Sequence, residues 1–148
     1  MAVLTTDVLR LAYQVSGPAE GAPVLLLHGW PDAARGWDRV AGLLHARGWR
    51  TVVPDLRGSG ATRFHDPGTV RDGQAVALAS DALDLADALG LDRFPVLGHD
   101  WGGRVAYTLA ALAPERITAI ASLALAYSHG RCSRCRTSAR RSPSGTSG

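Results

Sequence analysis

The sequence predicts an α/β protein with a mostly parallel sheet and helices on both faces. The main observation is that short apolar runs alternate with stretches of helical periodicity from Pro23 to Ala126, a pattern typical of βαβ units with right-handed crossovers. A second observation supports a packed core, because 46% of the 148 residues are hydrophobic and only 20% are charged.

The first elements follow from local patterns. Residues 8–15 alternate in part between apolar and polar side chains and end at a Ser-Gly-Pro turn, so we expect a short strand. Residues 23–27 form a compact apolar run and are expected to form a buried strand. Residues 33–47 have apolar residues at helical spacing, with Asp32 as the expected N-cap and Gly48 as the expected C′ residue.

The alternation continues through the rest of the body. A β-branched run predicts a strand, and the segment after it, rich in Gly, Pro and Asp, predicts a loop. The rest of the body is expected to form a helix, a strand, a second helix and a last strand, in that order. In chain order, these six segments are residues 50–54, 55–71, 74–89, 94–97, 102–112 and 117–126.

The chain divides by composition into a body, residues 1–127, and a tail, residues 128–148. The tail consists mainly of Arg, Ser, Gly and Cys without periodicity and is expected to be disordered. Five of the 16 basic residues and none of the 13 acidic residues follow Ser128, so the tail carries the whole positive excess of the net charge of +3. The body therefore offers no basic face for nucleic acid.

Several features indicate the compartment and exclude some partners. The first 11 residues lack a basic start followed by an apolar run, and the longest apolar stretch, residues 117–127, is too short to cross a bilayer. Both cysteines, Cys132 and Cys135, lie in the tail, and with His129 they offer only three of the four ligands of a structural zinc site. We expect a cytoplasmic protein with no metal, cofactor, nucleic-acid or membrane partner; the oligomeric state stays open.

One motif carries the chemistry. Gly98-His99-Asp100-Trp101-Gly102 has the form Gly-x-nucleophile-x-Gly between an expected strand and an expected helix, with Asp100 in the nucleophile position. The flanking Gly98 and Gly102 would let the strand and the helix approach closely around a sharp turn. The backbone N–H of Trp101 would then form half of an oxyanion hole. The alternative is that Asp100 only caps the following helix.

A second motif supplies the other half of the oxyanion hole. His28-Gly29-Trp30 follows the expected strand 23–27, and the backbone N–H of Trp30 is the expected donor. We interpret His28 as a hydrogen-bonded structural histidine rather than a base, and Gly29 as support for the loop. Asp55, at another strand end, is interpreted as a carboxylate that pairs with Arg57 or caps a turn, rather than as a catalytic acid.

Together these motifs resemble the N-terminal half of an α/β-hydrolase of the epoxide hydrolase-like branch. Residues 28–32 resemble that family's oxyanion-loop motif, residues 98–103 resemble its nucleophile elbow, and residues 57–64 and 74–90 resemble the segment between them. The resemblance covers nearly all of residues 8–127. It implies a partial α/β-hydrolase fold in which the lid and the C-terminal strands are missing.

An Asp nucleophile changes the reaction class. A carboxylate is ionised at neutral pH and needs no base to attack an sp³ carbon, where it forms an ordinary ester. The resemblance therefore implies a small-molecule substrate, an epoxide that would be hydrolysed to a diol. Dehalogenation of an alkyl halide through the same ester is the alternative. Trp rather than Asn at position 30 favours the epoxide.

The family's general base is a histidine late in the chain, paired with an acid, and its lid also follows the strand at residues 117–126. None of the five histidines here matches that base; they are His28, His45, His65, His99 and His129. We therefore expect a truncated hydrolase that can be alkylated once and does not turn over. A non-catalytic fragment is the alternative from another class.

Overall fold

The structure is a computed structural model in which residues 1–124 are described. The tail, residues 128–148, with its two cysteines, and the last residues of the expected strand 117–126 lie outside the described residues. Within residues 1–124, no helix is long and apolar enough to cross a membrane.

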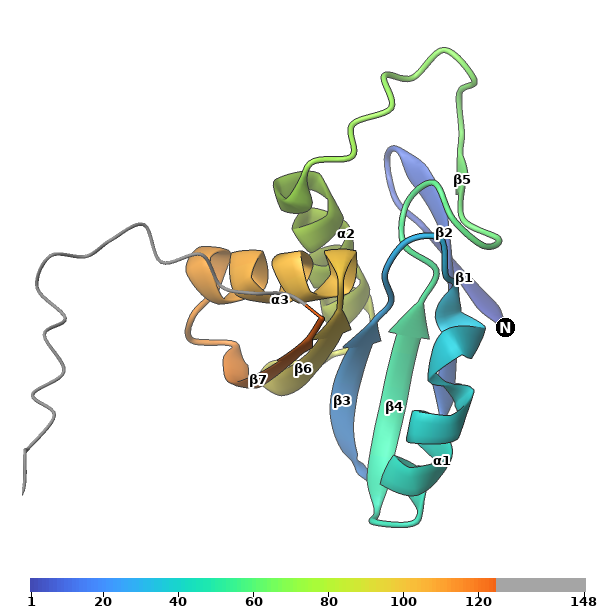
Figure 1. The fold of residues 1–148 in the computed structure, drawn as a ribbon. Helices are drawn as coiled ribbons and strands as arrows, with labels where there is room; N and C mark the ends of the chain where they lie inside the picture. Colours follow the sequence, from blue (N-terminus) through green and yellow to red (C-terminus); the bar gives the residue numbers. More distant parts are fainter. Residues whose placement is uncertain (125–148) are drawn as a thin grey trace, which may run out of the picture.

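Strands and helices alternate along the chain as expected (Figure 1). In chain order, the elements are β1 (Ala2–Thr5), β2 (Leu9–Ser16), β3 (Ala22–Leu27), the 3₁₀ helix η1 (Ala34–Trp37), α1 (Asp38–His45), β4 (Trp49–Pro54), β5 (Arg63–Phe64), α2 (Ala75–Ala88), β6 (Phe94–His99), α3 (Trp101–Leu112) and β7 (Ile117–Leu123).

All strands belong to one mixed sheet with the order β1-β2-β4-β3-β6-β7, to which β5 is added by pairing with β2. The four strands β4, β3, β6 and β7 are parallel, so the predicted parallel sheet is confirmed. Strands β1, β2 and β5 pair in antiparallel fashion. The sequence analysis missed β1 and β5, because a four-residue strand and a two-residue strand are too short for periodicity to show.

Helices cover both faces of the sheet, and strand β3 shows how. Val24 and Leu26 belong to the cluster on the side of η1 and α1, whereas Leu25 and Leu27 belong to the larger cluster with α2 and α3. Alternate residues of a strand point to opposite faces, so a run that is apolar at every position can serve two cores. In Figure 1, α1 accordingly lies on one side of the sheet, and α2 and α3 lie on the other.

Two boundaries differ from the prediction in ways that bear on the site. The first helical segment is a 3₁₀ turn followed by α1, and its N-cap is Ala33 rather than Asp32. Ala33 has no side-chain cap, and the Asp32 carboxylate instead accepts the neighbouring amide of Ala33 at 2.8 Å. Helix α1 ends at His45 with Ala46 as its C-cap, so Gly48, with φ +83°, lies two residues beyond the cap and one beyond the C′ position expected for it.

The sheet order explains how the site residues meet. Strand β3 lies between β4 and β6 and is parallel to both, so the three carboxyl ends lie at the same edge. The loops that follow them, residues 28–33 after β3, residues 55–62 after β4 and Asp100 after β6, are therefore neighbours.

Truncation of a core side chain on α2 tests the packing. Leu85 is fully buried in the larger cluster, so Leu85→Ala should lower the free energy of unfolding by about 2–5 kcal/mol through lost burial and a cavity. Leu43→Ala, on α1, is the matched control. Because Leu43 is 61% exposed, this variant should stay within about 0.5 kcal/mol of the parent in urea denaturation.

Candidate active site

Asp100 is the only residue between β6 and α3. Strand β6 ends at His99, two residues later than expected, and α3 begins at Trp101, one residue earlier than expected. Asp100 has φ 50° and ψ −113°, a conformation that L-residues rarely adopt. Its backbone N–H donates to the carbonyl of Leu123 at the end of β7, at 3.0 Å. The turn therefore holds Asp100 in a strained conformation of the kind that clusters at functional sites.

Gly98 and Gly102 are needed because a side chain at either position would collide with neighbouring backbone, and not because of their backbone torsion angles. A Cβ atom on Gly98 would collide with the carbonyl of Gly102, and a Cβ atom on Gly102 would collide with the carbonyl of Leu27. The elbow thus brings the start of α3 against the ends of β6 and β3, and no side chain fits between them. This agrees with the spacing that predicted the motif.

The loop after β3 reaches the Asp100 carboxylate. The backbone N–H of Trp30 donates to Oδ2 of Asp100 at 3.1 Å. A Cβ atom on Gly29 would lie 2.6 Å from Cβ of Asp100, so a larger residue would push the two loops apart. The Trp30 indole is 78% exposed, which means that the backbone of this residue, not its side chain, makes the contact.

The amide of Trp101 lies at the first position of α3, where a helix offers no carbonyl acceptor. The carbonyl of Asp100 accepts from Gly103 at 3.0 Å and from Arg104 at 3.2 Å. The Trp101 indole is 39% exposed and stacks near the Arg104 guanidinium, 5.2 Å from the ring centre. The amide of Trp101 therefore has no acceptor within α3, and it follows Asp100 directly in the chain.

His28 is buried and hydrogen-bonded through both ring nitrogens. Nδ1 lies 2.8 Å from the carbonyl oxygen of Gly29, and Nε2 accepts the backbone N–H of Leu56 at 3.0 Å. Because the Leu56 amide donates to Nε2, the ring proton lies on Nδ1 and is donated to the Gly29 carbonyl. His28 links the loop after β3 to the loop after β4.

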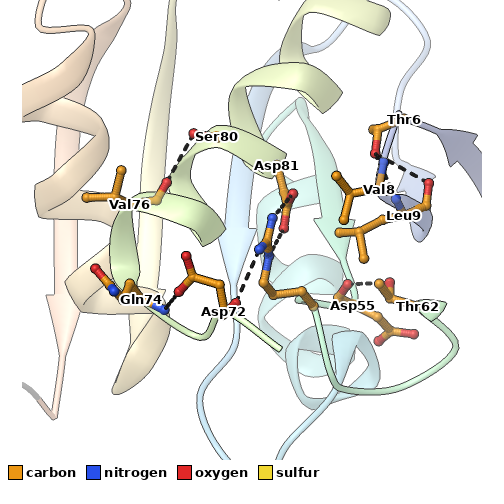
Figure 2. Close-up of polar contacts among 11 residues, drawn as sticks. Thr6, Val8, Leu9, Asp55, Thr62, Asp72, Gln74, Val76, Ser80 and Asp81 are labelled. Atoms are coloured by element: carbon orange, nitrogen blue, oxygen red, sulfur yellow. Dashed lines mark hydrogen bonds and ion pairs between the residues drawn. The ribbon is translucent and has the colours of Figure 1, made fainter. Parts of the chain in front are cut away.

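Arg57 pairs with Asp81 of α2 and not with Asp55, which corrects one of the two expected roles of Asp55. Nε and Nη2 of Arg57 donate to the two carboxylate oxygens of Asp81, each at 2.6 Å (Figure 2, where Asp81 is labelled). Burial raises the pKa of Asp81 above its ordinary value, although the hydrogen bonds from Arg57 oppose this change. The hydrogen bond with Asp81 raises the pKa of Arg57.

One feature of the sequence, the position of Asp81 on an apolar helix face, indicates the Arg57–Asp81 pair. Asp81 lies three residues after Leu78 and four before Leu85, so it falls on the buried face of α2. A carboxylate on an apolar helix face requires a partner, because an unpaired buried charge is costly. The expectation that Asp55 caps a turn is confirmed, since its carboxylate accepts the amide of Ala61 at 2.8 Å.

A pocket of about 450 Å³ lies between the loops after β3 and β4 and the start of α2. Most of its wall is apolar, with polar groups at a few positions. The side chains around it include Trp30, Pro31, Asp32, Leu56, Arg57, Ser59, Leu78 and Trp101. Asp100 is not among the lining residues, but Trp101 follows it directly in the chain and its side chain approaches Gly29, and both of these residues line the pocket. The pocket is large enough for a small apolar molecule near the carboxylate.

No group of three or more His, Cys, Asp or Glu side chains in residues 1–124 is arranged to hold a metal ion.

The sheet order, the strained turn and the amide donors define the class of protein. Comparison with known families agrees, because the profile of the alpha/beta hydrolase fold matches residues 22–135, well over half of the chain. The chain belongs to the alpha/beta hydrolase fold family.

Epoxide hydrolases are among its relatives. A soluble epoxide hydrolase of Corynebacterium sp. (strain C12) is 40% identical over 101 residues, which cover 68% of this chain and 33% of that protein. A solved structure of a candidate epoxide hydrolase of Klebsiella pneumoniae subsp. pneumoniae is 42% identical, with a TM-score of 0.77 over 81% of this chain and 40% of that one. An epoxide hydrolase of Vigna radiata is 33% identical, with a TM-score of 0.74 over 84% of this chain and 40% of that one. The chain thus spans about a third to two fifths of the length of these proteins.

A methyl group at the elbow should destabilise the fold. In Gly102→Ala the new Cβ meets two backbone carbonyls that cannot turn away, so we expect a loss of about 1–3 kcal/mol in the free energy of unfolding. Gly42→Ala is the control, because nothing lies within 4 Å of the added atom in α1. That variant should gain about 0.5–1 kcal/mol. Equal effects of the two variants in denaturant unfolding would contradict the close approach.

Loss of the buried ion pair between Arg57 and Asp81 should lower the free energy of unfolding more than loss of the more exposed pair between Arg116 and Asp87. The side chains of Arg57 and Asp81 are 11% and 7% exposed, so Asp81→Asn leaves a poorly solvated guanidinium and should cost about 3 kcal/mol. Asp87→Asn removes the pair with Arg116, in which the Asp87 side chain is 64% exposed, and should cost about 0–1 kcal/mol. Thermal unfolding of both variants measures the two losses of stability, and a smaller loss for Asp81→Asn than for Asp87→Asn would contradict this prediction.

Proposed function

We propose that Asp100 is the nucleophile of an α/β-hydrolase that opens epoxides through a covalent ester. The observation that carries the proposal is the hydrogen bond of 3.1 Å from the Trp30 amide to the carboxylate of Asp100 at a strained turn. The likeness to epoxide hydrolases supports the choice of substrate. An Asp that only capped α3 would accept from α3 itself, yet α3 has no side-chain cap from Asp100.

The first step forms the ester. The carboxylate oxygen of Asp100 that is not hydrogen-bonded to Trp30 attacks an epoxide carbon, and the ring C–O bond breaks as the new C–O bond forms. The resulting alkoxide takes a proton from water or from a donor at the open side of the pocket. The carboxylate needs no base for this step, because it is already ionised at neutral pH.

The second step would hydrolyse the ester. Water attacks the carbonyl carbon of the Asp100 ester, and negative charge develops on the carbonyl oxygen. The amides of Trp30 and Trp101 would donate to that oxygen, which is the function of an oxyanion hole. Collapse of this intermediate releases the diol and restores the carboxylate.

The second step also needs a general base to activate the water. In the described part of the chain, the histidines that form side-chain hydrogen bonds use groups other than Asp100 as partners: His28 bonds Leu56, His45 bonds Thr51 and His65 bonds Thr6. We therefore infer that, with the groups that residues 1–124 supply, the ester forms and the diol is released very slowly.

Incubation with styrene oxide tests the proposal. Intact-mass spectrometry should show the addition of one epoxide, and peptide mapping should place it on Asp100. Asp100→Asn should give no adduct, because an amide is not an effective nucleophile. Asp38→Asn, which alters an exposed carboxylate on α1, should react like the parent chain.

Each alternative gives a different result in the same assay. Adduct formation with a chloroalkane but not with the epoxide would favour a dehalogenase, and no adduct with either reagent would favour a non-catalytic fragment. Continuous release of diol would contradict the inferred lack of a base.

A further inference from the structure

Asp55 is a buried carboxylate with a protein partner on every polar atom. It follows the last residue of β4 and is 6% exposed. Oδ1 accepts the backbone N–H of Ala34 and Oδ2 accepts that of Ala61, each at 2.8 Å. Its backbone carbonyl accepts the hydroxyl of Thr62 at 2.6 Å (Figure 2), and its own N–H donates to Ala12 at 2.9 Å. The carboxylate therefore has one fixed position.

The contact with Ala34 supplies a cap that the local sequence lacks. Ala34 is the first residue of η1, and the preceding Ala33 has no side chain that could accept its amide. Asp55 accepts this amide from a different loop, 21 residues away in the chain. The end of the loop after β3 is thereby held by the residue that follows β4.

The start of the same loop has a second anchor at the next residue of the β4 loop. Nε2 of His28 accepts the amide of Leu56 at 3.0 Å. Trp30, whose amide donates to Asp100, lies between the two anchors, His28 and Ala34. Gly60 packs directly against the Asp55 carboxylate with φ +52°, so the carboxylate fills the space beneath this loop.

We propose that Asp55 is a positioning residue, whose carboxylate fixes the loop after β3 so that the Trp30 amide faces Asp100. Asp55 does not touch Asp100, and it acts through the Ala34 amide and the backbone that leads to Trp30. The catalytic consequence rests on the proposed function, but the contact itself can be measured without any substrate.

NMR spectroscopy of the full 148-residue chain tests this role. In the parent chain, the Trp30 amide should exchange slowly for an exposed loop, and its chemical shift should change when Asp100, whose carboxylate it contacts, is replaced by Asn. Ala34→Pro removes the N–H that Asp55 accepts and places a ring carbon in its direction, so the contact between the two loops is lost. Proline is compatible with the first helical position, and the extended backbone of Ala33, with φ −146° and ψ 177°, suits a residue before proline.

Ala34→Pro should raise the exchange rate of the Trp30 amide about tenfold or more, the effect of losing one hydrogen bond to a charged acceptor. It should also reduce by at least half the change in the Trp30 chemical shift that Asp100→Asn causes. Asp55→Asn should act in the same direction, because an amide oxygen can serve only one of the two backbone amides. The circular dichroism spectrum shows which of the two variants folds like the parent chain, and the behaviour of the Trp30 amide in that variant tests the proposal.

Asp81→Asn is the matched control. It makes the same chemical change at another buried carboxylate, which holds Arg57 of the β4 loop to α2 without contacting the loop after β3. It should lower stability and leave the Trp30 amide unchanged. A folded Ala34→Pro or Asp55→Asn chain with parent-like behaviour of Trp30 would overturn the proposal, as would an equal effect in Asp81→Asn. Failure of Asp100 to react with an epoxide would contradict the proposed function alone.

Discussion

The hydrogen bond from the Trp30 amide to the Asp100 carboxylate is the contact on which the candidate site depends. It joins residues 70 positions apart in the chain and exists because β3 and β6 are parallel neighbours with their carboxyl ends at one edge. The absence of side chains at Gly29 and Gly102 allows the approach, since a Cβ atom at either position would meet backbone or Asp100 within 3 Å. The fold therefore fixes both the position of the carboxylate and the direction of the donor that faces it.

Sequence reasoning predicted the parts of this arrangement that have a local cause. The elbow and the strand before it follow from glycine spacing and an apolar run, and both were placed within two residues. The tertiary contacts had no such pattern. The partner of Arg57 lies 24 residues away on α2, and the cap of η1 comes from Asp55 rather than from the adjacent Asp32. A side chain chosen by distance in space cannot be found by spacing in the sequence, although a polar residue on an apolar helix face shows that a partner is required.

Family membership and the proposed activity rest on different parts of the chain. The family is established by a profile that matches residues 22–135 and by sheet order, which involve the whole body. The proposed ester chemistry rests on Asp100 and two amides at the ends of β3 and β6. The chain spans about 40% of the solved relatives and includes both of these loops. The two conclusions can therefore be tested separately, the first by structure and the second by chemical modification of one carboxylate.

The backbone of Asp100 has a further attachment, the hydrogen bond from its amide to the carbonyl of Leu123 at the end of β7. In the part of the chain that the structure describes, β7 is an outer strand that pairs only with β6. Outer strands with one neighbour open more readily than central ones. Asp100 is thus attached to the margin of the sheet through its backbone amide and to the loop after the central strand β3 through its carboxylate. A strand added beside β7 would restrict the opening of that margin and, through the Leu123 carbonyl, hold the backbone amide of Asp100 in place.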